Sequence, residues 1–397
     1  MIGDESAAAE RAAWLALAAV PGIGAVLFAR LVGAFGSARA SLEAAAAGQL
    51  GGTGRELGIP APARRAIAEG LEAAATRAGA LAELGLWTLT PLDAAWPGRL
   101  AVVAELPPVL YGWGDPNVLS APRAIAIVGT RRPTLVGRAL TSRIATAVAL
   151  REAVVVSGLA IGIDGAAHAA CLAAGGRTVA VIGAGHRSPG PTAHRDLVRR
   201  AIDGGGAVVS ELHPDLPASR GTFPRRNRII SGLADATVIV EAPRRSGALI
   251  TGSHALEQGR PLFVAPGRPE DPATAGCLDL LAESDARPVA SIAHLIDDLG
   301  WERQDSVLRA RLEPPEEERG WLPGSVEQEL ARIVAAGPAT LDALVTRTGL
   351  PPGTVAGALT LLQLRGWVRP MHGTYLAAGP LLAGRVGRAA PSRPRSA

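Results

Sequence analysis

One stretch of the sequence decides the fold: Ile125-Ala126-Ile127-Val128-Gly129-Thr130-Arg131-Arg132-Pro133. Its first four residues form an uninterrupted apolar run, which is typical of a strand buried on both faces of a parallel sheet. Gly129 then permits a tight turn, and a helix is expected to begin near Gly137. Such a turn brings backbone amides, Thr130 and Arg131 to the end of the strand, where an anion would bind. Taken alone, the arginine pair fits a solvated surface equally well.

The same alternation of short apolar runs and helical stretches continues along the chain. Five more β-branched runs follow, at 154–156, 178–182, 207–210, 237–240 and 262–264. The expected helices cover 137–151, 164–175, 192–203, 226–233, 246–258 and 291–300. Right-handed crossovers place the loops after parallel strands along one rim of the sheet, where such sheets bind ligands. The sequence therefore predicts an α/β fold, an extended Rossmann-like parallel sheet domain over residues 91–301.

The segments on either side of this domain have a different composition. Residues 1–90 are rich in alanine and leucine and predict an N-terminal helical domain, similar to SAM or helix-hairpin-helix modules. Residues 12–29 carry no charge and are nearly long enough to cross a bilayer, but Pro21-Gly22-Ile23-Gly24 interrupts them. We therefore expect two helices joined by a turn, and no membrane partner.

The C-terminal part predicts a further small domain. Residues 302–324 are charged and contain prolines, as expected of a linker. Residues 325–378 predict three helices and a hairpin, which is the pattern of a winged helix. The expected recognition helix, 352–365, carries a single arginine. Residues 379–397 combine arginine with proline and serine and predict a disordered basic tail.

Composition and missing motifs argue for binding rather than catalysis. The chain has no lysine, so all 40 of its Lys and Arg residues are arginines, and its formal net charge is +4. Neither a Walker A lysine nor a GxSxG elbow is present, and the two cysteines lack metal-type spacing. His186, His194 and His213 fall on expected loops, as surface histidines do. We expect no cofactor, no metal and a cytoplasmic protein, because the N-terminus lacks a basic leader.

Three further loops at the expected rim contain polar groups. The segment 157–168 begins with Ser157 and Gly158 and supplies Asp164 as an expected N-cap. Ser246 and Gly247 open a later helix. The densest segment is Arg220-Gly221-Thr222-Phe223-Pro224-Arg225-Arg226-Asn227-Arg228. Arginines that pair with phosphates beside an exposed aromatic that stacks on bases would grip a single strand. In the alternative interpretation, the aromatic is buried and some arginines pair with Glu211 or Glu241.

Four motifs together resemble the DNA-processing protein A family, also called DprA or Smf. They are the segments 127–133, 157–168, 223–233 and 246–251, supported by Pro-Pro-x-Leu-Tyr-x-x-Gly at 107–114. The resemblance implies a dimeric, non-enzymatic protein that binds single-stranded DNA and loads RecA recombinase during natural transformation. The implied DNA-binding residues are Gly129, Thr130, Arg131, Arg132, Ser157, Gly158, Arg220, Phe223, Arg225, Asn227, Arg228, Ser246 and Gly247. The chain departs from the family pattern at 185–194 and near Cys277.

Two other functions compete with this one. A nucleotide-processing enzyme of a related Rossmann family, such as a phosphoribohydrolase, would need a Pro-Gly-Gly-x-Gly-Thr loop and an adjacent glutamate. That loop is absent from the sequence, and Glu241 is the one carboxylate near an expected strand end that could serve. A transcription regulator would read DNA through the helix 352–365, whose single arginine suits a protein contact better than base readout.

Overall fold

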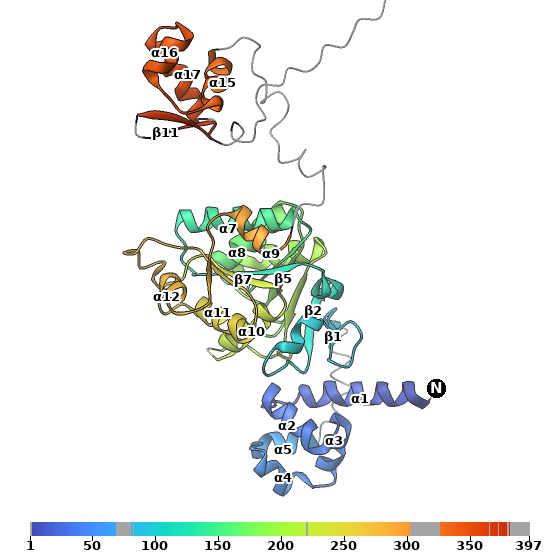
Figure 1. Ribbon diagram of the computed structural model, residues 1–397. Helices are drawn as coiled ribbons and strands as arrows, with labels where there is room; N and C mark the ends of the chain where they lie inside the picture. The colour runs from blue at the N-terminus through green and yellow to red at the C-terminus, as the bar shows by residue number, and fades with distance from the viewer. Residues whose placement is uncertain are drawn as a thin grey trace, which may run out of the picture. The chain divides into compact units, whose positions relative to one another are not determined.

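The computed structural model describes residues 2–68, 81, 83–219, 221–301, 326–364, 366–371, 373–378 and 381. The chain divides into two compact units, Met1–Gln304 and Asp305–Ala397, and each is described by itself. The first unit contains a large sheet with helices on both faces and a group of N-terminal helices, and the second is small (Figure 1).

The described part of the first unit is built on a nine-stranded sheet in the order β1-β2-β6-β5-β4-β3-β7-β8-β9. The strands are β1 Trp87–Leu89, β2 Leu110–Gly114, β3 Ala124–Val128, β4 Val154–Ser157, β5 Thr178–Val181, β6 Ala207–Ser210, β7 Ala236–Ile239, β8 Leu262–Val264 and β9 Arg287–Pro288. Strands β3 to β9 pair in parallel, with Ala126 opposite Val156 on one side and Thr237 on the other. The predicted α/β fold with a large parallel sheet is confirmed. The six apolar runs that were predicted as strands correspond to β3 to β8.

Strands β1 and β2 extend the sheet beyond its predicted edge. Strand β2 pairs antiparallel with β6, and β1 pairs antiparallel with β2. The Trp87 indole lies over Gly112, where an added Cβ would come within 2.2 Å of the ring, and its Nε1 donates to the Gly114 carbonyl at 2.8 Å. A three-residue strand is too short to show a period in the sequence. The expected boundary at residue 90 is therefore corrected, because β1 precedes it and belongs to the sheet.

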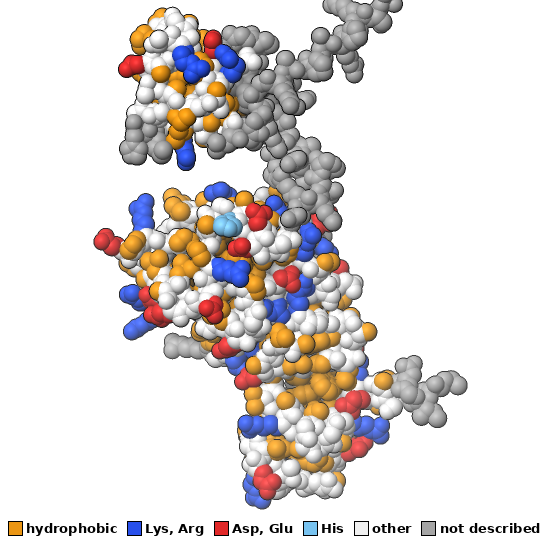
Figure 2. Space-filling view, viewed as in Figure 1, with side chains coloured by type: hydrophobic (Ala, Val, Ile, Leu, Met, Phe, Trp, Pro, Cys, Tyr) orange, Lys and Arg blue, Asp and Glu red, His pale blue; other side chains and the backbone are white. Residues whose placement is uncertain are grey.

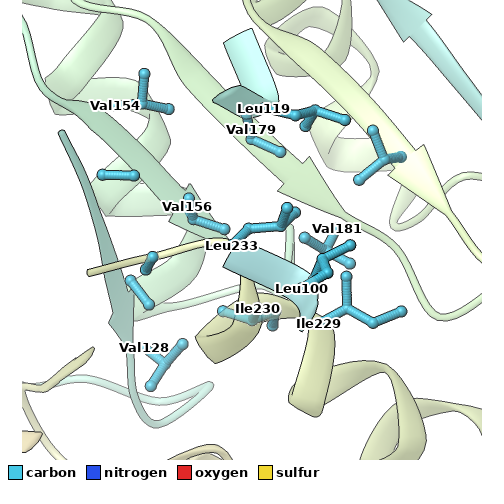
Figure 3. Close-up of a cluster of buried hydrophobic side chains, with 14 of the residues drawn as sticks. Leu100, Leu119, Val128, Val154, Val156, Val179, Val181, Ile229, Ile230 and Leu233 are labelled. Carbon is cyan, nitrogen blue, oxygen red and sulfur yellow. The ribbon is translucent and has the colours of Figure 1, made fainter. Parts of the chain in front are cut away.

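Helices cover both faces of the sheet (Figure 1). One face carries α7 Leu135–Ala149, α8 Ile163–Ala173, α9 Arg195–Asp203 and α13 Ile292–Asp298; the other carries α10 Thr222–Gly232, α11 Gly247–Glu257 and α12 Ala275–Glu283. Alternate strand residues serve the two faces, since Ile127 packs in the cluster with α7 and Val128 in the cluster with α10. Figure 3 shows Ile230 of α10 and Leu233, the residue after this helix, among the strand valines of this second cluster. Short 3-10 helices lie at Gly98–Val102, Pro116–Ser120 and Thr192–His194.

Two local expectations about helix starts were wrong. Helix α10 begins at Thr222, not near residue 226, and Pro224 is tolerated because its position in the first turn needs no amide donor. The N-cap of α8 is Gly162 instead of Asp164, with φ +103°. The side chain of Asp164 accepts a hydrogen bond from the Gly158 amide at 3.2 Å and so fixes the preceding loop.

The N-terminal helices form their own core within the first unit. They are α1 Ile2–Ala18, α2 Ala25–Phe35, α3 Ala38–Ala46, α4 Leu50–Glu56 and α5 Ala61–Ala68. The predicted turn separates α1 from α2, and Gly22 at φ +87° makes it. Trp14 Nε1 donates to the Pro108 carbonyl at 2.6 Å, which ties α1 to the sheet region. Within the described ranges no single helix is long and apolar enough to span a membrane, although α2 and α3, bent by 81°, pass that test as a pair.

The second unit has the predicted winged-helix architecture. Its elements are α15 Val326–Ala336, β10 Ala339–Thr340, α16 Leu341–Thr348, α17 Pro352–Leu364, β11 Val368–Met371 and β12 Thr374–Ala377. The strands pair in the order β10-β12-β11, and the helices bury Leu330, Leu344 and Leu359 against one another. The predicted linker 302–324 and, apart from Leu381, the predicted tail 379–397 lie outside the described residues.

His186 is not the surface histidine that its loop position suggested. Its side chain is 1% exposed and lies edge-on to Trp113, with ring centroids 4.7 Å apart. Its Nε2 is 3.0 Å from the Val208 carbonyl. The histidine therefore packs as a core residue at the corner where the chain departs from the family pattern.

A second buried histidine, His168, makes stability depend on pH. Thr178 Oγ1 donates to the Val155 carbonyl at 2.7 Å, so it accepts from His168 Nδ1 at 2.6 Å. His168 Nε2 has no hydrogen-bond partner within the described residues. Burial, with smaller effects of His194 and Arg226, lowers the pKa of His168 to about 3. The ring is therefore neutral in the folded protein near pH 5, whereas in the unfolded chain it is largely protonated there.

We expect the free energy of unfolding to fall as the pH is lowered, because the unfolded chain binds a proton that the folded protein excludes. Between pH 7 and 5 this one histidine accounts for about 2 kcal/mol, on a reference pKa of about 6.5. Urea unfolding at several pH values checks this against His168→Gln, which should lose about 2 kcal/mol less over that range. Equal losses in both proteins would contradict the assignment.

Candidate nucleic-acid interface

A groove opens at the carboxyl ends of β3 and β7. These strands are neighbours, but the chain continues from β3 into α7 on one face and from β7 into α11 on the other. Loops that part in this way leave a crevice, which is the usual ligand site of open parallel sheets. The groove has a volume of about 640 Å³. Its lining includes Gly129, Thr130, Arg131, Arg132, Phe223, Asn227, Ser246 and Gly247, and also Asp164, Arg226, Arg245 and Ile250.

Glu241, at the end of β7, holds the arginine loop after β3 in place. Its carbonyl accepts from the Thr130 amide at 2.6 Å, and its carboxylate accepts from the Thr134 amide at 2.9 Å and from the Thr134 hydroxyl at 2.5 Å. Thr134 in turn caps α7 by accepting from the Gly137 amide at 3.0 Å. The carboxylate occupies the space where a Gly137 side chain would lie. Glu241 is thus buried and engaged by Thr134, and among the described residues it forms no ion pair with an arginine.

Arg226 fixes the floor of the groove. This side chain is only 6% exposed, and its Nη1 donates to the carbonyls of Gly158, at 2.7 Å, and Val181. Asp164 also contacts Gly158, and an added Cβ on Gly158 would lie 2.6 Å from Arg226 Nη1 and 2.7 Å from Asp164 Oδ2. Burial lowers the pKa of Arg226 to about 10, and the charge of Asp164 opposes that shift. Arg226 therefore stays charged at neutral pH. Burial raises the pKa of the Asp164 carboxyl, and the Arg226 charge opposes that rise.

The other arginines of α10 point away from the groove. Arg228 is 4% exposed; it pairs with the Glu211 carboxylate through N–O distances of 2.6 and 2.8 Å and donates to the Glu105 carbonyl at 2.7 and 3.0 Å. Arg225 is exposed, and its guanidinium reaches Gly24 of the N-terminal turn, where an added Cβ would lie 2.8 Å from Nη2. The alternative of a structural ion pair with Glu211 is thus confirmed for Arg228.

The mouth of the groove presents cations beside an aromatic ring. The Arg131 guanidinium lies over the ring of Phe223, 5.6 Å from its centroid, and Phe223 is 36% exposed. Arg132 and Arg245 are exposed on the same groove. Across the described residues, none of these three arginines lies in an ion pair. In the view of Figure 2, arginine and acidic side chains are otherwise interspersed. The three arginines at the groove would therefore attract an anion to this place.

The predicted site residues separate into three groups. The groove brings together Gly129, Thr130, Arg131, Arg132, Phe223, Asn227, Ser246 and Gly247. Of these, Ser246 caps α11 by accepting from the Ala248 amide at 3.3 Å, and Asn227 donates to the Gly247 carbonyl at 3.0 Å. The structure does not bring Ser157, Gly158, Arg225 and Arg228 to the groove lining. Ser157 is fully buried, and its hydroxyl donates to the Ile127 carbonyl at 2.6 Å. Arg220 lies outside the described residues.

Two arginines that line the groove, Arg226 and Arg245, were not among the predicted site residues. Arg245 follows β7 just as Arg131 follows β3, and its position after a strand was a usable signal. Arg226 had no such signal, because adjacent arginines on a helix differ in burial only through the tertiary packing. For metal binding, the described ranges contain no group of three or more histidine, cysteine or acidic side chains that could hold an ion.

The close approach of two loops at Gly162 gives a prediction. An added Cβ there would lie 2.4 Å from the Thr130 carbonyl oxygen, on a backbone with φ +103°. Gly162→Ala should therefore push the arginine loop outward and lower the free energy of unfolding by about 2–3 kcal/mol. Gly175→Ala is the matched control, because Gly175 also has a positive φ, +74°, but no atom within 4 Å of an added Cβ. Urea unfolding measures both, and equal losses would mean that the loops are not in contact.

Comparison with known proteins gives three family matches along this chain. The family described as DNA recombination-mediator protein A matches residues 87–300, the DprA-like N-terminal HHH domain matches 8–73, and the DprA winged helix domain matches 312–374. The putative DNA processing protein DprA of Mycobacterium tuberculosis (strain ATCC 25618 / H37Rv) is 35% identical over 373 residues, which cover 88% of this chain and 91% of that protein.

Two solved structures are also similar. DNA processing protein A from Streptococcus pneumoniae has a TM-score of 0.60 and 29% identity, and the match covers 71% of this chain and 95% of the other. A structure that describes single-stranded DNA binding by DNA processing protein A from Helicobacter pylori has a TM-score of 0.49 and 30% identity, and covers 54% and 95% of the two chains.

Proposed function

This chain belongs to the DNA recombination-mediator protein A family, and we propose that its strand-end groove binds the backbone of single-stranded DNA. The observation that carries the proposal is the Arg131 guanidinium over the Phe223 ring, with Arg132 and Arg245 exposed on the same groove. Arginine forks pair with successive phosphates, and the face of an exposed aromatic ring stacks on any base. This combination holds a strand without reading its sequence.

The preference for single strands follows from the aromatic. In a duplex the bases are paired and stacked inside, so Phe223 has no base face to contact. The arginines alone would bind either form through their phosphates. We therefore propose that Phe223, 36% exposed beside Arg131, supplies the discrimination between single strand and duplex.

The groove is proposed to hold its ligand without catalysis. Glu241 is engaged by Thr134, and Asp164 is buried beside Arg226 and accepts from the Gly158 amide. General acid or base catalysis needs a titratable group within reach of a substrate proton. Asp164 lines the groove, but its carboxyl accepts from the Gly158 amide beside the Arg226 cation, so we propose that the groove binds without catalysis and that the protein is not an enzyme.

The finer role rests on the family. We propose that the protein works as a homodimer in the cytoplasm and loads RecA recombinase onto the bound strand during natural transformation. Sedimentation of the purified protein with and without oligo-dT tests the dimer. RecA filament assembly on a protein-covered strand tests the loading step, and a rate no higher than without the protein would contradict it.

Strand preference is the experiment that tests the binding function. Fluorescence anisotropy compares labelled oligo-dT with a duplex of the same length under the same salt. We expect tighter binding of the single strand and an affinity that falls as salt rises, because counterions are released from each paired phosphate. Equal binding of both forms, or binding of neither, would overturn the proposal.

A further inference from the structure

The first turn of α7 carries two apolar side chains that are almost fully in solvent. Leu135 is 86% exposed and Val136 is 76% exposed. Ile161, on the loop before α8, is 50% exposed. Single exposed apolar residues are common, but two adjacent ones at these values leave most of their hydrophobic surface in water. We therefore infer that these side chains contact a ligand.

This apolar group is held firmly next to the groove. Thr134, immediately before Leu135, is anchored by two hydrogen bonds to the Glu241 carboxylate. Ile161 precedes Gly162, and the Ile163 amide donates to the Thr130 carbonyl at 3.1 Å. The loops that carry the three side chains are thus bonded to the same Thr130–Thr134 segment that presents Arg131 and Arg132.

Cations lie on both sides of the apolar pair in the sequence. Arg131 and Arg132 precede it, and Arg138, also exposed, follows it on the first turns of α7. A single DNA strand offers matching chemistry, since each nucleotide joins a phosphate to a base with an apolar face. A protein partner would need an interface of roughly 800 Å² on each side, much more than three side chains provide.

We propose that Leu135 and Val136 form a second base-contact platform, onto which a single strand passes as it leaves the groove over Arg131 and Arg132. This inference rests on the proposed function and extends it. Phe223 contacts a base inside the groove, and the aliphatic pair contacts the bases or sugars of the next nucleotides. The bound footprint is therefore longer than the groove itself.

An abasic strand separates this contact from the phosphate contacts. The double variant Leu135→Ser/Val136→Ser keeps residues that suit a helix N-terminus. Its affinity for oligo-dT should fall about 5- to 10-fold, as expected for losing apolar contact with about one base. Its affinity for an abasic strand of the same length should stay that of the wild type, and so should the salt dependence.

Two further variants complete the experiment. Leu92→Ser is the matched control, because Leu92 is 49% exposed but follows β1 at the far edge of the sheet. It should bind both strands like the wild type. Phe223→Ala serves as the benchmark for losing a base contact, and it should likewise weaken oligo-dT binding more than abasic binding.

Two results would overturn the platform. They are unchanged oligo-dT affinity in the double variant, and an equal loss on oligo-dT and the abasic strand. If unchanged affinity came with a loss of RecA binding, the pair would be assigned to a protein contact. Thermal unfolding of the variants establishes that they are folded, and Ile161→Ser repeats the test from the neighbouring loop. If the wild type bound no single strand, the proposed function itself would fail, a result distinct from these two.

Discussion

Glu211→Ala is expected to lower the free energy of unfolding by about 3–5 kcal/mol, because it leaves the Arg228 cation buried without its carboxylate. The pair is nearly inaccessible, with side-chain exposures of 5% for Arg228 and 10% for Glu211. Its two N–O contacts of 2.6 and 2.8 Å are the fork geometry that makes arginine–carboxylate pairs strong. Two carbonyl acceptors, those of Glu105 and Arg225, remain after the change but cannot neutralise the charge.

Denaturant unfolding measures this loss, and a surface pair supplies the control. Arg244 and Asp279 also form a two-contact pair, at 2.8 and 3.2 Å, but with exposures of 71% and 38%. Asp279→Ala should leave stability almost unchanged, since exposed pairs are screened by water. Similar effects of the two substitutions would show that Arg228 is not buried as described, and would return it to the candidate DNA-binding residues.

Arg131→Ala is expected to weaken oligo-dT binding about 10-fold or more and to make the affinity less dependent on salt. One arginine supplies a charge-assisted phosphate contact, and its loss reduces the slope of log affinity against log salt by about 0.7 for a single strand. The substitution also removes the cation over the Phe223 ring, which leaves the aromatic without that neighbour. Titrations at several salt concentrations measure both quantities.

The matched control removes the same charge elsewhere. Arg39 is exposed on the N-terminal helix α3, where it pairs with Glu43 at 2.7 Å. Arg39→Ala should change the affinity little. If Arg131→Ala and Arg39→Ala behaved alike, net charge and not the groove would determine binding. Arg131→Lys should fall between the wild type and Arg131→Ala, because it keeps the charge and loses the planar fork.

Much of the fold could be predicted from the sequence because buried parallel strands leave a strong pattern. The runs that became β3 to β8 are apolar except for single Thr or Ser residues, and the glycines and polar residues after most of them mark the strand ends. Strands β1 and β2, which extend one end of the sheet, left no such pattern, since β1 has three residues and contacts β2 through Trp87 over Gly112. Contacts of that kind depend on distant segments and cannot be read locally.

The position of the candidate site could be predicted from the sequence, but only some of the residues that form it could. The prediction placed the loops after the parallel strands along one rim of the sheet. The strand order, which makes β3 and β7 neighbours and brings their loops together, came only from the structure. The helical start at Thr222 was not predicted, and it decides which arginines of α10 are buried. Once the segment is helical, Arg226 turns under the groove and Arg228 toward Glu211. The pattern of charges alone could not show that these two arginines are buried while Phe223 is exposed at the groove.

Hydrogen exchange with and without oligo-dT tests most directly whether the groove holds the strand. We expect slower exchange of backbone amides on binding in three segments, 129–136, 222–224 and 245–248, which line or flank the groove. The winged-helix segment 352–364 should be unaffected. Protection confined to that helix or to the N-terminal turn at 21–24, with no change in the three groove segments, would show that the groove does not hold the strand.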